Sequence, residues 1–130
     1  MFEPAIVTAR EMSGNATFLP QFGVDWGVVC TGLHVQLTWA RYEPGTPYKM
    51  HKHDYEQVSV LLEGRLRLTV GDLTRDIAAG DIWFAPAGVL HGGEVIGSEA
   101  AVFLDIYGPP DENIFGFLRA DEEPDGISGD

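Results

Sequence analysis

Three of the four histidines in the sequence stand, together with one glutamine, at spacings that suit a metal site. His51 and His53 are two residues apart, and Gln57 follows four residues after His53. On a β-strand, residues of equal parity point to the same face, at a rise of roughly 3.3 Å per residue. The spacing therefore predicts that both imidazoles and the Gln57 amide oxygen face one ion. His91, which begins another strand, can close the site from across a barrel.

The chemistry of these ligands indicates an open, catalytic type of site. Imidazole nitrogens bind Zn, Fe, Ni, Cu and Mn ions at roughly 2.0–2.2 Å and discriminate poorly among them. We expect one divalent transition-metal ion, of Fe, Mn, Ni, Zn or Cu. Three histidines and an amide leave positions for water or substrate, and four neutral ligands would leave the ion its full double charge. If a bulge shifts the strand, Glu56 would supply a carboxylate in place of Gln57.

The segments that carry these residues have the pattern of an all-β fold. From Gly32 onward, runs rich in Val, Leu, Ile, Phe, Trp and Thr recur at roughly 8–12-residue spacing, with Gly, Pro or Asp between them. This pattern predicts a β-sandwich or β-barrel. We predict strands over residues 32–43, 55–63, 65–70, 73–79, 81–86, 92–97 and 100–107, with one or two more between residues 5 and 30. In the first of these strands, Leu33, Val35, Leu37 and Trp39 share one face, which is predicted to be apolar and packed.

Length and composition favour one globular unit. The chain has 130 residues, 45% of them hydrophobic, which is enough to bury a core. No linker or internal repeat divides it, so we predict a single domain over residues 1–120. The last ten residues hold five acids beside Pro124, Gly126 and Gly129, a composition that buries little. Residues 121–130 are therefore predicted to be a disordered acidic tail.

Charge and cysteine content restrict the partners and the compartment. Eight basic and twenty acidic residues give a net charge of −12, which repels phosphate backbones and anionic membrane surfaces. We expect neither nucleic acid nor a membrane as a partner. The start of the chain lacks the pattern of a signal peptide, and Cys30, the single cysteine, allows no intramolecular disulfide. These features indicate a cytoplasmic protein, and the apolar run around Cys30 predicts a buried thiol.

The first of two motifs around the candidate ligands resembles that of the cupin superfamily. Gly45 precedes His51 by five intervening residues, His53 follows, and Gln57 and Gly64 complete the spacing. Gln57 stands where the superfamily more commonly has Glu.

The second cupin motif follows in register. Gly80, Pro86, Gly88 and His91 have the family spacing, and Val95 replaces the usual Asn. The joint match spans residues 45–95 and is specific because so many spaced positions agree. The resemblance implies a jelly-roll barrel whose interior is lined by the histidines, and proteins of this size in the superfamily usually form homodimers.

A finer resemblance points to a reaction class. The segments HKHDYEQVSVLLEGRLRLTVGD and LDIYGPPDENIF are similar to those of KdgF-type cupins, which open unsaturated monouronates to linear keto acids. By that resemblance, Asp105 would transfer protons and Tyr107 would line the pocket. Asp111 stands where that group commonly has an Arg able to pair with the uronate carboxylate, and a carboxylate there would repel the substrate.

The fold alone leaves other functions open, because one barrel hosts many reactions. A metal-dependent dioxygenase or a cyclase for diketone, aromatic or polyketide-like substrates would use the same ligands. Its apolar pocket would come from Trp39, Trp83, Phe84 and Phe103. A cupin that binds a small molecule without turnover is the third class.

Overall fold

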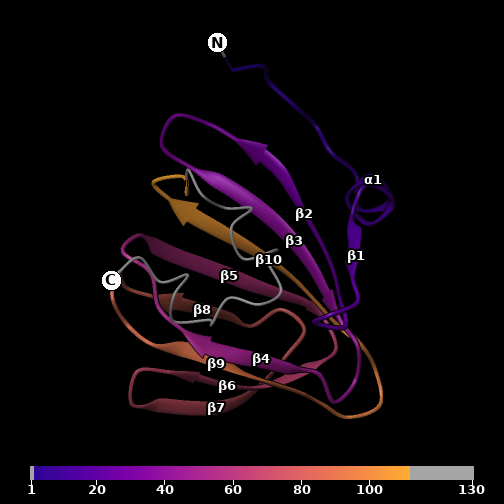
Figure 1. The fold of residues 1–130 in the computed structure, drawn as a ribbon, viewed down its shortest axis with the longest axis vertical. Helices are drawn as coiled ribbons and strands as arrows, with labels where there is room; N and C mark the ends of the chain where they lie inside the picture. Colours follow the sequence, from indigo (N-terminus) through magenta and orange to yellow (C-terminus); the bar gives the residue numbers. More distant parts are fainter. Residues whose placement is uncertain (1, 112–130) are drawn as a thin grey trace.

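A computed structural model describes residues 2–111 of the chain (Figure 1). Residue 1 and residues 112–130 lie outside the described part, and with them the predicted acidic tail. The described chain contains one short helix and ten strands. These are α1 (Ala9–Gly14), β1 (Thr17–Leu19), β2 (Val24–Thr31), β3 (Gln36–Tyr42), β4 (Pro47–His51), β5 (Glu56–Glu63), β6 (Arg65–Val70), β7 (Leu73–Ala78), β8 (Ile82–Ala85), β9 (His91–Ile96) and β10 (Ala101–Gly108).

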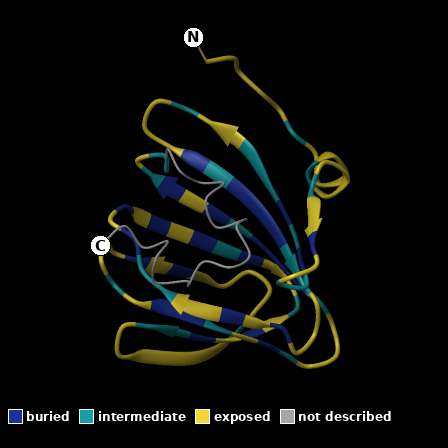
Figure 2. Cartoon of the chain, in the orientation of Figure 1, coloured by how far each residue is buried: buried dark blue, intermediate teal, exposed yellow. Residues whose placement is uncertain are grey.

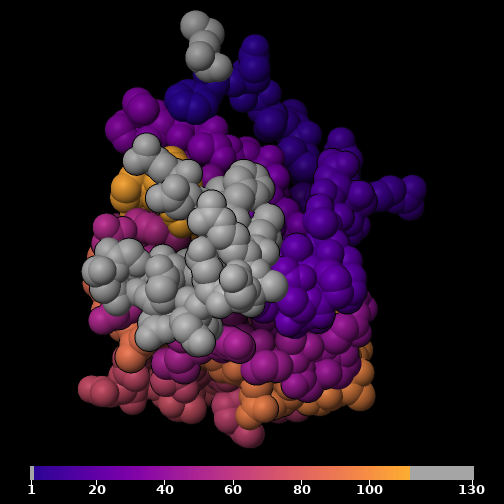
Figure 3. All heavy atoms as spheres, in the orientation of Figure 1, coloured from indigo at the N-terminus to yellow at the C-terminus, as the bar shows by residue number. Residues whose placement is uncertain are grey.

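The strands form two antiparallel sheets that pack against each other, as in a jelly roll. The larger sheet has the order β1-β2-β3-β10-β5-β8 and the smaller one the order β4-β9-β6-β7. The strand ladders run within each sheet and do not join the two sheets into a closed barrel. The core, which includes Trp26, Leu61, Leu66 and Phe103, lies between the sheets. The helix α1 buries no residue and lies at one edge of the molecule, in the indigo segment that Figures 1 and 3 show at the upper right. The all-β jelly-roll prediction is therefore confirmed.

The predicted strands correspond to β3 and β5–β10, and the strands expected near the N-terminus are β1 and β2. One strand, β4, was not predicted. It begins with Pro47 and has a polar sequence, so it carries only a weak strand pattern. Among the described residues no helix is long and apolar enough to cross a membrane.

The face assigned to the first predicted strand is wrong at its N-terminal end, although Trp39 on that face is buried. Leu33 and Val35 precede β3 and are exposed, whereas Gln36 and Thr38 point inward and are 3% and 0% exposed. The inner face of the larger sheet is polar at this end because it surrounds the candidate site. Figure 2 shows the alternation of buried and exposed residues along β5. Cys30, at the end of β2, is exposed, so the predicted buried thiol is also wrong.

Cross-strand register places the polar residues of the larger sheet in rows. One row runs across β3, β10, β5 and β8 through Thr38, Asp105, Ser59 and Trp83. The adjacent row runs through Gln36, Tyr107, Gln57 and Ala85. Side chains at paired positions lie on one face within contact distance. Register therefore brings Asp105, Ser59 and Gln57 together from strands that are far apart in the sequence.

In the smaller sheet, a glycine brings β4 and β9 together beside the histidines. His51 and His91 are cross-strand partners. A Cβ on Gly92 would lie 2.6 Å from the Tyr48 carbonyl oxygen and 2.8 Å from Met50 backbone atoms, so no larger residue fits without a shift of the strand. The absence of a side chain at position 92 thus permits the approach that sets His51 opposite His91.

Candidate active site

The three predicted histidine ligands converge between the two sheets. Their nearest ring nitrogens lie within 4.8 Å of one another, and the ring centroids of His51 and His91 are 4.3 Å apart. His51 ends β4, His53 lies in the following loop, and Gln57 belongs to β5 of the other sheet. The expectation that one strand aligns these residues by parity is therefore wrong. They converge because the chain crosses from one sheet to the other between His51 and Gln57.

Backbone carbonyl groups orient each imidazole. The Nδ1 atoms of His51, His53 and His91 lie 2.8, 2.9 and 3.0 Å from the carbonyl oxygens of Lys49, Tyr55 and Val89, respectively. A carbonyl oxygen only accepts hydrogen bonds, so each Nδ1 carries a proton and the Nε2 atoms remain as the candidate ligand atoms. Burial lowers the pKa of His51 to about 4 and that of His91 to about 3. Both rings are therefore neutral at pH 7.

Gln57 is fully buried and presents its amide oxygen to the histidines. Gln57 Oε1 lies 3.0 Å from His53 Nε2 and 3.1 Å from His91 Nε2. The Gln57 amide nitrogen faces the other way and donates to Ser59 Oγ at 2.9 Å and to Asp105 Oδ1 at 3.2 Å. Its neighbour Glu56 is exposed and does not reach the histidines.

This arrangement fits a bound cation. The Gln57 amide oxygen, which can only accept hydrogen bonds, lies 3.0 Å from His53 Nε2 and 3.1 Å from His91 Nε2. A cation placed among these atoms would be held by the amide oxygen and the ring nitrogens together. Three imidazole nitrogens and an amide oxygen are a donor set that a divalent transition metal accepts. His51, His53 and His91 can therefore hold a metal ion, with Gln57 in position as the fourth ligand.

Asp105 lies on β10 next to this site and is 5% exposed. Its Oδ1 accepts hydrogen bonds from Ser59 Oγ at 2.5 Å and from Gln57 Nε2 at 3.2 Å, and its Oδ2 accepts one from Tyr107 Oη at 3.4 Å. Burial raises the pKa of Asp105 to about 6, although the three hydrogen bonds oppose that rise. A carboxyl group with a pKa this close to neutrality can both take up and release a proton.

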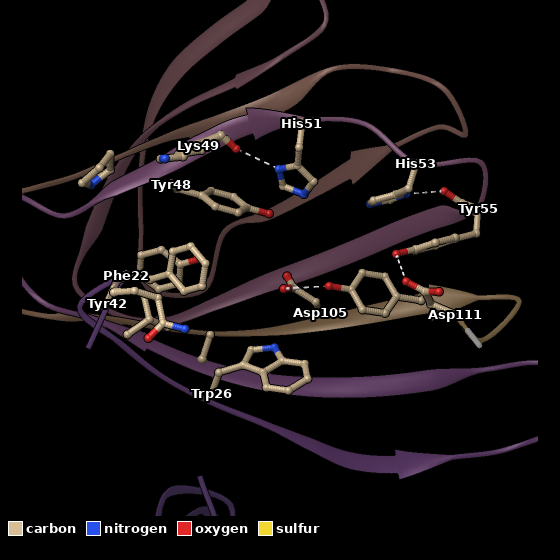
Figure 4. A pocket seen from close by; sticks show the side chains of 15 residues that line it. Phe22, Trp26, Tyr42, Tyr48, Lys49, His51, His53, Tyr55, Asp105 and Asp111 are labelled. Atoms are coloured by element: carbon tan, nitrogen blue, oxygen red, sulfur yellow. Dashed lines mark hydrogen bonds between the residues drawn. The ribbon is translucent and has the colours of Figure 1, made fainter. Parts of the chain in front are cut away.

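A cavity of about 270 Å³ opens onto these groups (Figure 4). Six of its fifteen lining residues are Phe, Trp or Tyr, and the polar ones include two of the histidines and Asp105. The lining residues are Gln21, Phe22, Val24, Trp26, Ala40, Tyr42, Pro47, Tyr48, Lys49, His51, His53, Tyr55, Asp105, Tyr107 and Asp111. The structure thus brings the predicted residues Asp105 and Tyr107 to the same cavity as two of the histidines.

The aromatic wall differs from the predicted one. None of the four residues expected to form an apolar pocket lines the cavity. Trp83 and Phe103 belong to the core, and Phe84 is exposed. Trp39 follows the inward-facing Thr38 on β3 and therefore lies on the opposite face of that strand. Phe22, in the turn between β1 and β2, and Trp26, on β2, could not be found from the sequence because nothing marks them as neighbours of the motifs. Ser59 was also missed, although its equal parity with Gln57 on β5 was a usable signal.

Asp111 reaches the cavity through a tyrosine that packs on a histidine. Tyr55 Oη donates to Asp111 Oδ2 at 2.7 Å, and the backbone N–H of Asp111 donates to Gln36 Oε1 at 3.2 Å. The Tyr55 ring stacks on the His53 imidazole, with centroids 4.0 Å apart and planes 3° apart. Burial, followed by the Asp111 bond, raises the pKa of Tyr55, so its hydroxyl stays protonated as a donor. Asp111 therefore anchors the aromatic ring that covers His53.

Comparison with known proteins places the chain in a family. A family model described as a cupin domain matches residues 38–107. An uncharacterized protein of Streptomyces coelicolor is 30% identical over 69 residues, which cover 53% of this chain and 65% of that protein, so the match spans less than two thirds of its length.

Solved structures agree with this placement. The TT1209 protein of Thermus thermophilus is similar with a TM-score of 0.69 and 26% identity, over 80% of this chain and 96% of that one. KdgF from Halomonas sp. shares the fold with a TM-score of 0.66 and 18% identity, over 71% of this chain and 84% of that one. With the family match over more than half of its residues, the chain belongs to the cupin family.

Proposed function

We propose that this protein is a metal-dependent enzyme that moves a proton on a small oxygenated organic molecule bound in the cavity. The observation that carries the proposal is the double contact of Gln57. Its carbonyl oxygen faces His53 and His91, and its amide nitrogen donates to Asp105. The group suited to proton transfer is therefore fixed next to the group of candidate metal ligands.

His51, His53, Gln57 and His91 would hold the ion. A divalent transition metal bound there would act as a Lewis acid toward a hydroxyl or carbonyl oxygen of the substrate. Because all four ligands would be neutral, they would leave the ion its full double charge.

Asp105 is the proposed proton-transfer residue. As a carboxylate it would take the proton from a substrate hydroxyl, and as a carboxylic acid it would return a proton to carbon. Ser59 and Gln57 fix Oδ1, and Tyr107 contacts Oδ2, so the carboxyl group is held in one orientation. Tyr107 also lines the cavity and would contact the substrate.

The reaction class that needs only these groups is an isomerisation. Ring opening and tautomerisation of an unsaturated sugar acid removes a proton from oxygen and adds one to carbon, with no oxidant or other co-reactant. Aromatic walls with a few convergent polar groups are typical of small-molecule sites. We therefore propose an unsaturated monouronate as the substrate class.

A metal-dependent oxygenase or cyclase is the second candidate. The aromatic part of the wall, with Phe22, Trp26 and Tyr42 among its residues, favours an apolar substrate. A cupin that binds such a molecule without turnover would have the same wall. Oxygen dependence separates the oxygenase from the isomerase, and turnover separates both from the binding protein.

The test combines metal replacement with control of oxygen. The purified protein is stripped of metal, reloaded in turn with Fe, Mn, Ni, Zn or Cu, and assayed under argon and in air on unsaturated monouronates and diketones. The proposal predicts that the absorbance of the unsaturated uronate falls under argon with at least one of the metals. Oxygen consumption with a diketone, and no reaction of the uronate, would instead assign the protein to the oxygenases.

We also propose that the protein forms a homodimer through the outer face of the larger sheet. Exposed apolar residues lie in register there: Val58 on β5 pairs with Phe84 on β8 and with Ile106 on β10. Ile82 on β8 continues the same face and is 64% exposed. Contiguous exposed apolar surface of this kind favours association.

A further inference from the structure

Lys49 lies on β4 two residues before His51 and lines the same cavity. Its backbone carbonyl oxygen is the acceptor for His51 Nδ1 at 2.8 Å. The position of its main chain is therefore tied to that of a candidate metal ligand. The lysine side chain extends from this fixed point.

Lys49, which is exposed on β4, is the cationic residue among the described residues of the cavity lining. Among the described residues that line the cavity, it is the one Lys or Arg, and Asp105 and Asp111 are the acids. The ion pairs found in the described chain involve Arg41 and Arg67, and none of them engages the Lys49 ammonium group. In a protein with a net charge of −12, a lysine at the cavity with no partner acid in the described chain suits an anionic ligand.

The charged groups are separated along the cavity. Figure 4 shows Lys49 and Asp111 on opposite sides, with His51 and Asp105 between them. Asp111 accepts a hydrogen bond from Tyr55 Oη, and a carboxylate has about four acceptor sites in all. A ligand that spans the cavity therefore meets a cation at one end and an acceptor at the other.

We propose that Lys49 binds the carboxylate of the substrate and that Asp111 accepts a hydrogen bond from a hydroxyl group at its opposite end. The inference rests on the proposed function and defines the substrate class as a small hydroxy acid. It also accounts for an acid at position 111: the charge that an arginine would supply there comes from β4 instead. Lys49 would then be a specificity-determining residue.

The test compares an acid with its neutral counterpart. Binding of D-galacturonate and of D-galactose is measured by calorimetry, at low salt, on metal-loaded wild-type protein and on three variants. Lys49→Gln removes the charge, Lys49→Arg keeps it, and Lys52→Gln removes the charge of a nearby lysine outside the cavity lining. Metal content is determined for each variant, since the Lys49 backbone also orients His51.

Wild type is expected to bind the acid more tightly than the neutral sugar. Lys49→Gln should weaken binding of the acid about 2–5-fold, leave that of galactose unchanged and keep the metal, because an exposed lysine contributes modestly. Lys49→Arg and Lys52→Gln should retain the preference. An unchanged preference in Lys49→Gln, or no preference in wild type, overturns the proposal.

Asp111→Asn tests the other end of the layout. It should weaken binding of both sugars by a similar factor, because it removes the charge of the acceptor for a hydroxyl group that both possess. Tighter binding of the acid alone would show that Asp111 repels the carboxylate, and would overturn the assignment.

None of these binding measurements needs turnover, so they test the subsite separately from the proposed reaction. If the preference for the acid depends on Lys49 but no turnover is found, the carboxylate subsite is supported and the proposed reaction is wrong. If the uronate is turned over at the same rate without Lys49, the proposed reaction is supported and the subsite is wrong.

Discussion

Gln57 donates a hydrogen bond from its side-chain amide to Asp105 at 3.2 Å, and the carbonyl oxygen of the same amide faces His53 and His91. A carboxylate at position 57 could not form both contacts, since it has no donor and would face Asp105 as a like charge. The amide thus joins the candidate metal ligands to the candidate proton-transfer group. This relationship explains the value of glutamine at a position where cupins more often have glutamate.

The first prediction concerns the fourth ligand. Gln57→Ala should lower metal affinity at least about tenfold, because it removes a neutral ligand and the group that fixes its neighbours. Glu56→Ala, on the exposed face of the same strand, should keep the metal. Elemental analysis of both purified variants provides the measurement. Loss of metal only in the Glu56 variant would show that the wrong residue has been assigned.

The second prediction concerns Asp105. Asp105→Asn should reduce turnover of the substrate by about 10²–10⁴-fold, since the amide cannot exchange the proton. Metal content should remain close to that of wild type, because Asp105 is not a ligand. Ser59→Ala should have a smaller effect, since it removes one of three hydrogen bonds to the carboxyl group. Full turnover in Asp105→Asn would exclude Asp105 as the proton-transfer residue.

The sequence was sufficient to predict the fold and the convergence of three histidines, but not the cavity. Runs of β-forming residues and two spaced motifs predicted the strands and the convergence of His51, His53 and His91. The motif does not reveal why they converge, because the crossing between sheets and the loop position of His53 depend on tertiary packing. Alternation of Leu33, Val35 and Leu37 was misleading, since the interior at that end of β3 is polar. Trp26 and Phe22 reach the cavity because of the way the N-terminal strands pair, and the sequence pattern does not define that pairing.

The third prediction concerns pH and the metal-free protein. His51 and His91 have folded-state pKa values lowered to about 4 and about 3 by burial, below their ordinary value of 6.5. Between those values the unfolded chain binds protons that the folded chain does not, so stability should fall as the pH is lowered through 6.5 toward 4. The Asp105 pKa is raised to about 6, so this group makes the folded state more stable as the pH falls. Its effect is smaller than the combined effect of the two histidines.

Thermal unfolding of the metal-free protein between pH 7.5 and 5 tests this expectation. The melting temperature should decrease with falling pH, and the decrease should be smaller in the variant His51→Gln, which lacks one of the two groups. A melting temperature that is constant or rises over this range would contradict the neutral, buried state of the histidines.

The fourth prediction concerns Gly92. Gly92→Ala should destabilise the protein by about 1–3 kcal/mol, because its Cβ would lie 2.6 Å from the Tyr48 carbonyl oxygen. It should also weaken metal binding, since β4 would move away from β9 and His51 from His91. Gly14→Ala is the control, because nothing lies within 4 Å of a Cβ there. Denaturant unfolding and metal titration of both variants measure the two effects, and equal behaviour of the variants would contradict the account.

The fifth prediction concerns association. Phe84→Asp places a charge on the exposed apolar face of the larger sheet and should convert a dimer into a monomer in light scattering. Leu73→Asp, at a 70% exposed position on β7 of the other sheet, should leave the mass unchanged. A wild-type monomer, or a dimer disrupted only by the Leu73 variant, would rule out the proposed interface.

The most direct test of the central claim is proton NMR of the reaction in D₂O under argon, with metal-loaded protein and an unsaturated monouronate. The account predicts that the linear keto acid forms with one deuterium newly bound to carbon, and that Asp105→Asn, with its metal retained, forms it far more slowly. No product from the metal-loaded wild-type protein, or equal rates for the two proteins, would contradict metal-dependent proton transfer by Asp105.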